Sequence, residues 1–161
     1  MNTPDNLLPL LALLIPYYED TRIGACGFVA SSVNMDLARL ANRPHELHSF
    51  AQVTVQVTFA GRPNIVLRGK TDPEEQYERM PSVPFRKAAR GLWVPSAGEV
   101  AAQINASMHA VVLCKMKDGT YAILDGNEGQ FAHMEGDCTF HVQASDLEMK
   151  GATLSDPPAS A

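Results

Sequence analysis

MHAVVLCKMKDGTYAILD, the segment from Met108 to Asp125, decides how the fold of this chain is interpreted. A first apolar run leads to Asp118-Gly119, and a second apolar run follows it. Asp-Gly favours the tight turn between two antiparallel strands, because both of its residues tolerate a positive φ angle. We therefore predict a β-hairpin with a two-residue turn, in which Lys117 faces Thr120.

The predicted hairpin begins with a histidine, His109, and ends with an aspartate, Asp125. Counting outward from the turn places both residues at the same edge of the sheet. A carboxylate next to an imidazole can hold the ring in one tautomer and stabilise its charged form. This pattern is typical of a catalytic base with its orienting partner, but the hairpin itself contains no nucleophile.

Composition predicts one globular domain over residues 1–150, followed by a disordered tail at 151–161 that is rich in Pro, Ala and Ser. The net charge of -5 argues against nucleic acid as a partner, because a phosphate-binding face would be basic. The three cysteines are odd in number and show no Cys-x-x-Cys spacing. We therefore expect reduced thiols, with neither a metal nor another cofactor.

The apolar run from Leu7 to Ile15 is the one segment that could be mistaken for a targeting sequence. It has no basic flank and no cleavage pattern, and it is too short to span a bilayer. We predict a helix that begins near Thr3 and Pro4 and ends at Pro16, with no signal peptide and no membrane insertion. The protein is then expected to be cytoplasmic as synthesised.

Cys26 stands at the start of the next predicted helix, where Val29, Val33 and Leu37 recur at helical spacing. The N-terminus of a helix offers unpaired N–H groups and a partial positive charge, which favour a thiolate and, during a reaction, an oxyanion. The alternative is a small buried cysteine with a structural role. The presence of His109 and Asp125 later in the chain favours the reactive interpretation.

The remaining segments are expected to form mainly structural elements that support the fold. Alternating residues indicate a half-buried strand at 51–59 with a return at 65–67, and a capping box at Ser96 and Glu99 indicates a helix through about Ser107. Two short strands are expected around Phe131 and at 138–142. The segment 69–93 looks irregular, so a binding loop, a surface insertion and a partly disordered tract all remain open.

Several other residues could belong to a site, but a simpler explanation is preferred for each. Trp93 is assigned to the core rather than to a substrate platform. The residues with potential metal-binding or catalytic side chains are His45 and His48 in one group and His133, Asp137, Cys138 and His141 in another. We interpret the first group as a solvated loop and the second as the alternation of strands.

In chain order, the residues that carry chemistry are Cys26, His109 and Asp125. The imidazole would take the proton of the thiol to form the attacking thiolate, and the carboxylate would orient the imidazole. The backbone N–H of Cys26 is a natural donor to the oxyanion that forms when a thiolate attacks an amide carbonyl.

GACGFVASSV together with HAVVLCKMKDGTYAILD resembles the papain-like cysteine peptidase superfamily. In size and spacing the chain is most similar to its bacterial branch that trims double-glycine leader peptides and to small papain-like effectors. The resemblance implies an α+β fold in which N-terminal helices, one opened by Cys26, pack on an antiparallel sheet. It also implies that Cys26 is the nucleophile, His109 the general base and acid, and Asp125 the orienting residue.

Asp20 stands where this superfamily usually has the glutamine that completes the oxyanion hole, which makes it the oxyanion-hole candidate. An ionised carboxylate would repel an oxyanion, so Asp20 could serve only when protonated or in another geometry. We expect a cysteine hydrolase that acts on a protein or peptide substrate, at a peptide bond or a glutamine side chain, and that could be secreted as a bacterial effector or toxin. The alternative is an inactive papain-like domain that binds a protein partner.

Overall fold

The computed structural model describes residues 7–17, 25–40, 46–59, 82–96, 107–128, 138–148 and 152–153. The helices in these ranges are α1 (Leu8–Ala12) and α2 (Cys26–Arg39), with short 3-10 helices at Ile15–Tyr17 and Ala144–Glu148. The strands are β1 (Leu47–Phe59), β2 (Ser82–Ala89), β3 (Leu92–Pro95), β4 (Ser107–Met116), β5 (Tyr121–Leu124), β6 (Cys138–Gln143) and β7 (Ala152–Thr153).

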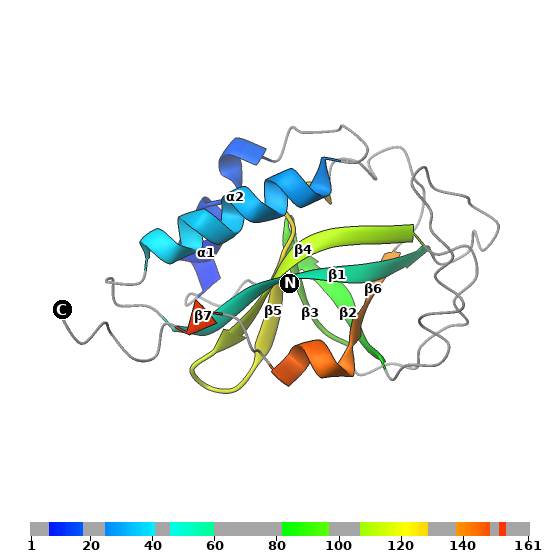
Figure 1. Cartoon of the computed structure of the whole chain (residues 1–161). Helices are drawn as coiled ribbons and strands as arrows, with labels where there is room; N and C mark the ends of the chain where they lie inside the picture. The colour runs from blue at the N-terminus through cyan, green and yellow to red at the C-terminus, as the bar shows by residue number, and fades with distance from the viewer. Residues whose placement is uncertain are drawn as a thin grey trace.

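Six of these strands close into an antiparallel barrel, with α2 lying across its outer surface over β4 and β1 (Figure 1). Around the barrel the order is β1, β4, β5, β3, β2 and β6, and β6 pairs with β1 again. Closure depends on β1, which is 13 residues long and therefore reaches both β4 and β6. β7 adds a short pairing at the other end of β1.

The predicted papain-like α+β fold, with helices packed on an antiparallel sheet, is therefore wrong. The described structure is mostly sheet, and the sheet closes on itself. The main reason is that β2 and the beginning of β3 lie within the segment 69–93, which the sequence had suggested was irregular. In β2, Pro84 and the consecutive charged residues Arg86 and Lys87 interrupt the alternation of apolar and polar residues that is typical of a strand. The element predicted around Cys26 does form, because α2 begins at this residue.

Two apolar clusters hold the barrel and its helices together. One fills the barrel and consists of Val55, Val57, Phe85, Trp93, Val111, Leu113, Ile123, Phe140 and Val142. The other lies between the helices and the outer surface of β1, β4 and β5, and includes Leu10, Leu14, Val33, Leu37, Phe50, Val112 and Leu124. The assignment of Trp93 to the core is confirmed. Alternate residues of β4 and β5 belong to different clusters, as the side-chain period of a strand requires.

The predicted strand at 51–59 is present as the larger part of β1. Its apolar residues Val55 and Val57 are buried in the barrel, but Gln56 on the opposite side is buried as well. The strand is thus buried on both sides here, whereas its alternating sequence had indicated one solvated side.

The hairpin of β4 and β5 forms as predicted, but its turn contains three residues rather than two. Lys115 pairs with Tyr121, and the N–H of Met116 donates to the carbonyl of Thr120. The prediction that Lys117 faces Thr120 is therefore wrong by one residue. Gly119, with a φ of 89°, closes the turn in the left-handed region, as is usual for three-residue hairpin loops.

The N-terminal helix is shorter than predicted, since α1 ends at Ala12 and a 3-10 helix follows at Ile15–Tyr17. Pro9 lies in the first turn of α1, where its missing N–H costs no helical hydrogen bond. No helix in the described part of the chain is both long and apolar enough to cross a membrane.

Other predictions fall on residues outside the described ranges. They concern Thr3, Pro4, the return at 65–67, the helix opened at Ser96 and Glu99, and the strand around Phe131. Ser107, which was expected to end that helix, begins β4 instead. The strand expected at 138–142 is confirmed as β6. Within the predicted tail at 151–161, Ala152–Thr153 form β7.

Close contact between α2 and the turn after β5 fixes the position of the helix. A Cβ atom added to Gly126 would lie 2.7 Å from Cγ1 of Val29 and 3.3 Å from Cγ2 of Val33. Only glycine allows the backbone to approach the helix so closely, because the β-branched valines of a helix have little rotamer freedom.

We expect Gly126→Ala to destabilise the protein by about 1–3 kcal/mol, the usual cost of overpacking a core. Thermal unfolding followed by circular dichroism measures the effect. Gly27→Ala is the matched control, because its Cβ would meet no atom within 4 Å and alanine favours the helix. Equal melting temperatures for the wild type and Gly126→Ala would show that α2 can move away from the turn without cost.

Candidate active site

Cys26 is the first residue of α2, at the end of the helix that faces the beginning of β4. Its N-cap residue, Ala25, makes no side-chain capping bond, and the partial positive charge of the helix N-terminus acts on the first turn. The sulfur of Cys26 accepts hydrogen bonds from the backbone N–H groups of Gly27 and Ala110 and contacts the imidazole of His109. The thiol is therefore surrounded by donors, and it is partly exposed, as a nucleophile must be.

The contact with Ala110 follows from the way the strands pair. The β4–β5 ladder begins only at Val112, so in the described structure the preceding residues of β4 have no strand beside them on this edge. The N–H of Ala110 donates to Cys26 instead. The N-terminus of α2 thus occupies a place where the barrel leaves an edge open.

His109 and Asp125 form a buried pair next to this thiol. Nε2 of His109 lies 2.8 Å from Oδ1 of Asp125, and both residues are only 1% exposed. Because Asp125 engages Nε2, Nδ1 is the ring nitrogen left for Cys26. The imidazole therefore bridges the thiol and the carboxylate, as the sequence suggested.

Two contacts hold Asp125 in place. Oδ1 of its carboxylate also accepts the N–H of Asn127 at 3.1 Å, and the backbone N–H of Asp125 donates to the carbonyl of Gly91 at 2.9 Å. The first of these bonds is the local turn that an aspartate makes with the residue two positions later. Because Oδ1 accepts two N–H groups, its orientation towards His109 is fixed.

The electrostatics of the group favour a thiolate next to an imidazolium. Burial by itself would lower the pKa of His109, but the charge and hydrogen bond of Asp125, together with Cys26, raise it to about 9. Burial would raise the pKa of Cys26, but the hydrogen bond from His109, the N–H of Ala110 and the imidazolium charge lower it below its usual value. Both shifts stabilise the ion pair over the neutral pair.

An aromatic stack supports the imidazole from inside the barrel. The ring of Phe140 lies 5.6 Å from that of His109 and is tilted by 57°. The ring of Trp93 stacks on Phe140, with the two ring centroids 3.7 Å apart. These residues come from β6 and β3, so the barrel core limits the rotation of His109.

The structure thus brings together Cys26, His109 and Asp125, the three residues singled out in the sequence. Asp20, the oxyanion-hole candidate, lies outside the described residues. The sequence interpretation missed the Ala110 N–H, because a backbone donor at an open strand edge leaves no trace in the side-chain pattern. It also missed Asn127, although an aspartate followed two residues later by asparagine at the end of a strand is a recognisable turn signal.

The second group of polar residues considered in the sequence is divided in the structure. His141 is buried on β6 and its Nε2 lies 2.9 Å from Oγ1 of Thr58, while burial lowers its pKa to about 4. His133 and Asp137 lie outside the described residues.

In the first group of polar residues, His48 lies in β1, not in a loop, and its Nδ1 contacts Oγ of Ser49. No cluster of three potential metal ligands occurs in the part of the chain that the structure describes.

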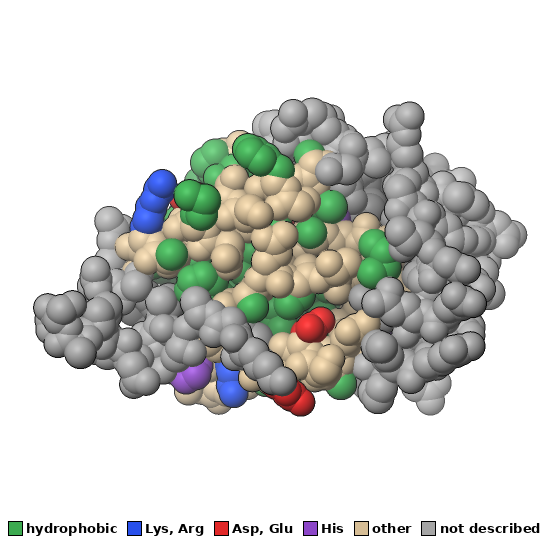
Figure 2. All heavy atoms as spheres, viewed as in Figure 1, with side chains coloured by type: hydrophobic (Ala, Val, Ile, Leu, Met, Phe, Trp, Pro, Cys, Tyr) green, Lys and Arg blue, Asp and Glu red, His purple; other side chains and the backbone are tan. Residues whose placement is uncertain are grey.

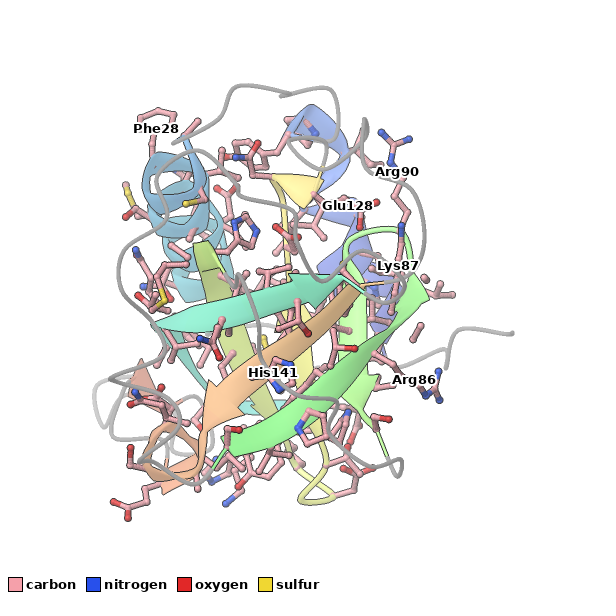
Figure 3. The ribbon with its side chains drawn as sticks, turned by 90° about the vertical axis from the view of Figure 1, so that its right-hand side faces the viewer. Phe28, Arg86, Lys87, Arg90, Glu128 and His141 are labelled. Atoms are coloured by element: carbon pink, nitrogen blue, oxygen red, sulfur yellow. The ribbon has the colours of Figure 1, made fainter. Side chains whose placement is uncertain are left out.

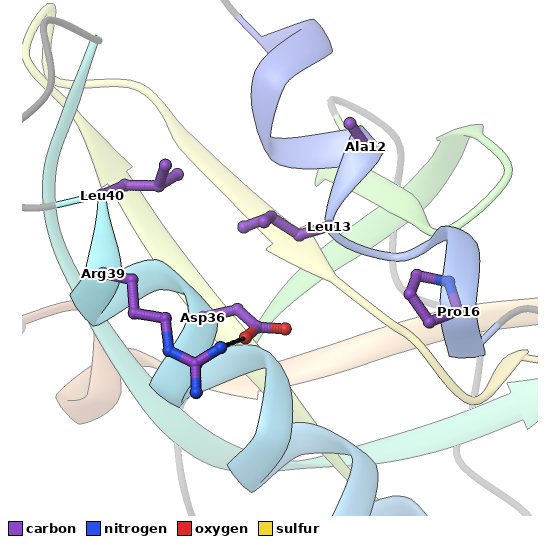
Figure 4. Close-up of a pocket in the computed structure, with 6 residues that line it drawn as sticks. All are labelled: Ala12, Leu13, Pro16, Asp36, Arg39 and Leu40. Carbon is purple, nitrogen blue, oxygen red and sulfur yellow. Dashed lines mark hydrogen bonds and ion pairs between the residues drawn. The ribbon is translucent and has the colours of Figure 1, made fainter.

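A hollow of about 290 Å³ lies at the opposite end of α2 (Figure 4). It is lined by Ala12, Leu13, Pro16, Asp36, Arg39 and Leu40. An ion pair between Asp36 and Arg39 forms part of its wall. At 1.5 Å per residue, this end of the helix is about 20 Å from Cys26, so the hollow is separate from the reactive group.

Comparison with known protein families, curated proteins and solved structures found no match for this chain.

We expect Cys26 to be alkylated by iodoacetamide much faster than the other two cysteines, with an apparent pKa below that of a free thiol. Cys114 is an internal control, because burial raises its pKa to about 12 and shields its sulfur. Peptide mapping after brief exposure to limiting reagent, repeated between pH 5 and 9, measures each rate. Alkylation of Cys26 at the rate of the denatured chain would contradict an activated thiolate.

Proposed function

We propose that this protein is a thiol hydrolase that attacks the amide carbonyl of a protein or peptide substrate. The observation that supports the proposal is the imidazole of His109, which bridges a partly exposed thiol and a buried carboxylate. Placement of the thiol at the N-terminus of a 14-residue helix gives further support, since that end of a helix stabilises negative charge.

Each residue has one role in the proposed reaction. The thiolate of Cys26 forms a bond to the carbonyl carbon, and the electron pair of the carbonyl moves to its oxygen. The proton held on Nδ1 of His109 passes to the leaving nitrogen as the carbon–nitrogen bond breaks, which leaves a thioester. A water molecule then gives a proton to His109 and attacks the thioester, so that the carboxylic acid leaves and Cys26 is regenerated.

Exposure of the residues indicates the side from which a substrate approaches. His109 and Asp125 are buried, while Cys26 is reached from the first turn of α2, where Gly27 faces open space. Phe28, on the outer side of the same turn, is 70% exposed (Figure 3). Figure 2 shows further apolar side chains on the surface where α2 lies. An apolar substrate segment next to the scissile bond would suit this surface.

The leaving nitrogen separates the two substrate classes that the sequence left open. Hydrolysis of a glutamine side chain releases ammonia and leaves the chain intact, whereas hydrolysis of a peptide bond creates a new amino terminus. Incubation with glutamine-containing peptides, followed by mass spectrometry and an ammonia assay, distinguishes these products. Tight binding of peptides without either product would favour the inactive binding domain instead.

We expect Cys26→Ala and His109→Ala each to reduce turnover to the background rate, because each removes a group that reacts. Cys138→Ala, which changes a cysteine outside the proposed site, is the control and should retain activity. Product formation is measured together with the melting temperature. Loss of folding in the first two variants would indicate that these residues are structural, whereas normal turnover would exclude the mechanism.

Asp125→Asn should lower activity on the order of 10- to 100-fold, as for the carboxylates that orient metal-bound histidines. The N–H of Asn127 would keep the amide oxygen directed at Nε2, so the variant removes the charge but retains the geometry. Wild-type activity should fall as pH rises through about 9, where His109 loses its proton. In Asp125→Asn this fall should occur at lower pH. An unchanged pH profile would show that Asp125 does not act on His109 electrostatically.

A further inference from the structure

Asp125 lies just beyond the ends of both ladders that could hold it. The β4–β5 ladder ends at the pair Val112 and Leu124, and the β3–β5 ladder contains only two pairs, the last of them Leu92 and Leu124. Strand ends without further pairing open easily, because few hydrogen bonds oppose their motion. Another contact is therefore needed to keep the carboxylate of Asp125 within 2.8 Å of His109.

Gly91, in the turn between β2 and β3, supplies this contact. Its carbonyl accepts the N–H of Asp125 at 2.9 Å, and its own N–H donates to Oε2 of Glu128 at 2.7 Å. Both polar groups of one residue are thus bonded to the four-residue segment that begins with Asp125. Gly91 has a φ of 76°, a conformation that other residues adopt with strain, so glycine is required at this turn.

The carboxylate of Glu128 is held on two sides. Oε1 lies 3.1 Å from Nζ of Lys87, while Oε2 accepts the N–H of Gly91. Figure 3 shows Glu128 on the side of the molecule where Lys87 and Arg90 of the β2–β3 hairpin lie. The Glu128 side chain is 13% exposed and that of Lys87 is 50% exposed. The bond to Gly91 is therefore the better shielded one, and the ion pair is exposed mainly on the side of Lys87.

We propose that Glu128 is a positioning residue for the reaction, which fixes Gly91 and through it holds Asp125 against His109. Glu128 touches neither the thiol nor the imidazole in this arrangement. It binds the N–H of Gly91, whose carbonyl accepts the N–H of Asp125 next to the last pair of the short β3–β5 ladder. The inference rests on the proposed function, because it assigns a role in keeping Cys26 activated.

Three variants of the full chain separate the bond to Gly91 from the charge of Glu128. Glu128→Gln keeps an oxygen acceptor for the Gly91 N–H but loses the charge. Glu128→Asp keeps the charge but is one methylene too short for the same reach. Lys87→Ala removes only the exposed half of the ion pair, and such pairs contribute little. The readout is the rate of Cys26 alkylation by iodoacetamide between pH 5 and 9, with circular dichroism to show that each variant is folded.

We expect Glu128→Asp to shift the alkylation profile of Cys26 to higher pH and to reduce its rate at pH 7 on the order of tenfold, the lower end of the cost of losing an orienting contact. Glu128→Gln and Lys87→Ala should give profiles close to the wild type. The reverse order, with Glu128→Gln impaired and Glu128→Asp normal, would overturn the inference, as would three normal profiles.

A purely structural role for Glu128 would lower the melting temperature of Glu128→Asp and leave the profile of its folded form unchanged, which would also overturn the inference. Failure of the proposed function is recognised separately, since wild-type Cys26 would then show no selective alkylation. If the wild type is activated and Glu128→Asp does not differ from it, only the role of Glu128 is excluded. If Glu128→Asp does not fold, Glu128→Met replaces it, because methionine is of similar length but offers no oxygen acceptor for the Gly91 N–H. The same shift of the alkylation profile to higher pH is then expected, and a profile close to the wild type would overturn the inference.

Discussion

Pairing of β1 with β4 is the constraint on which the rest of this structure depends. It joins two strands that are far apart in the sequence, from Leu47 opposite Met116 to Val57 opposite Ser107, and closes the sheet into a barrel. Closure decides which side of each strand is interior, so His109 and Val111 share the side that faces the core. It also places β4 under α2, so that the edge of β4 left open by β5 meets the N-terminus of that helix.

The proposed active site is therefore a property of the end of the barrel rather than of any one element. Cys26 comes from a helix, His109 from the start of a strand, and Asp125 from the residue after another strand. Burial of a carboxylate and an imidazole is costly unless each charge is paired. Here Oδ1 of Asp125 is paired with His109, and Cys26 contacts the same imidazole, so the three groups interact in a row. Removal of the negative charge of Asp125 would therefore change the proton affinity of Cys26 at the other end of the row.

The contacts around Asp125 link stability with the proposed chemistry. Gly126 allows the turn to approach α2, and Gly91 bonds to the same turn from the β2–β3 hairpin. The segment 125–128 thus connects the helix that carries Cys26 with the barrel that carries His109. A change in this segment is expected to affect the position of the Asp125 carboxylate more than the stability of the barrel. The reason is that no residue of this segment belongs to the apolar cluster inside the barrel.

The sequence by itself determined the local elements whose signals are contained in a few neighbouring residues: the helix opened by Cys26, the strand at 51–59 and the hairpin that carries His109 and Asp125. It also singled out Cys26, His109 and Asp125 as candidates, because thiol, imidazole and carboxylate chemistry is restricted to a few side chains. Only the tertiary structure decided that the sheet closes and that β2 and β3 are strands. It also decided the three-residue turn at Gly119, and that Ala110, Gly91 and Glu128 surround the site. The physical reason is that these features depend on backbone hydrogen bonds between distant segments, and a backbone N–H is the same in every residue except proline.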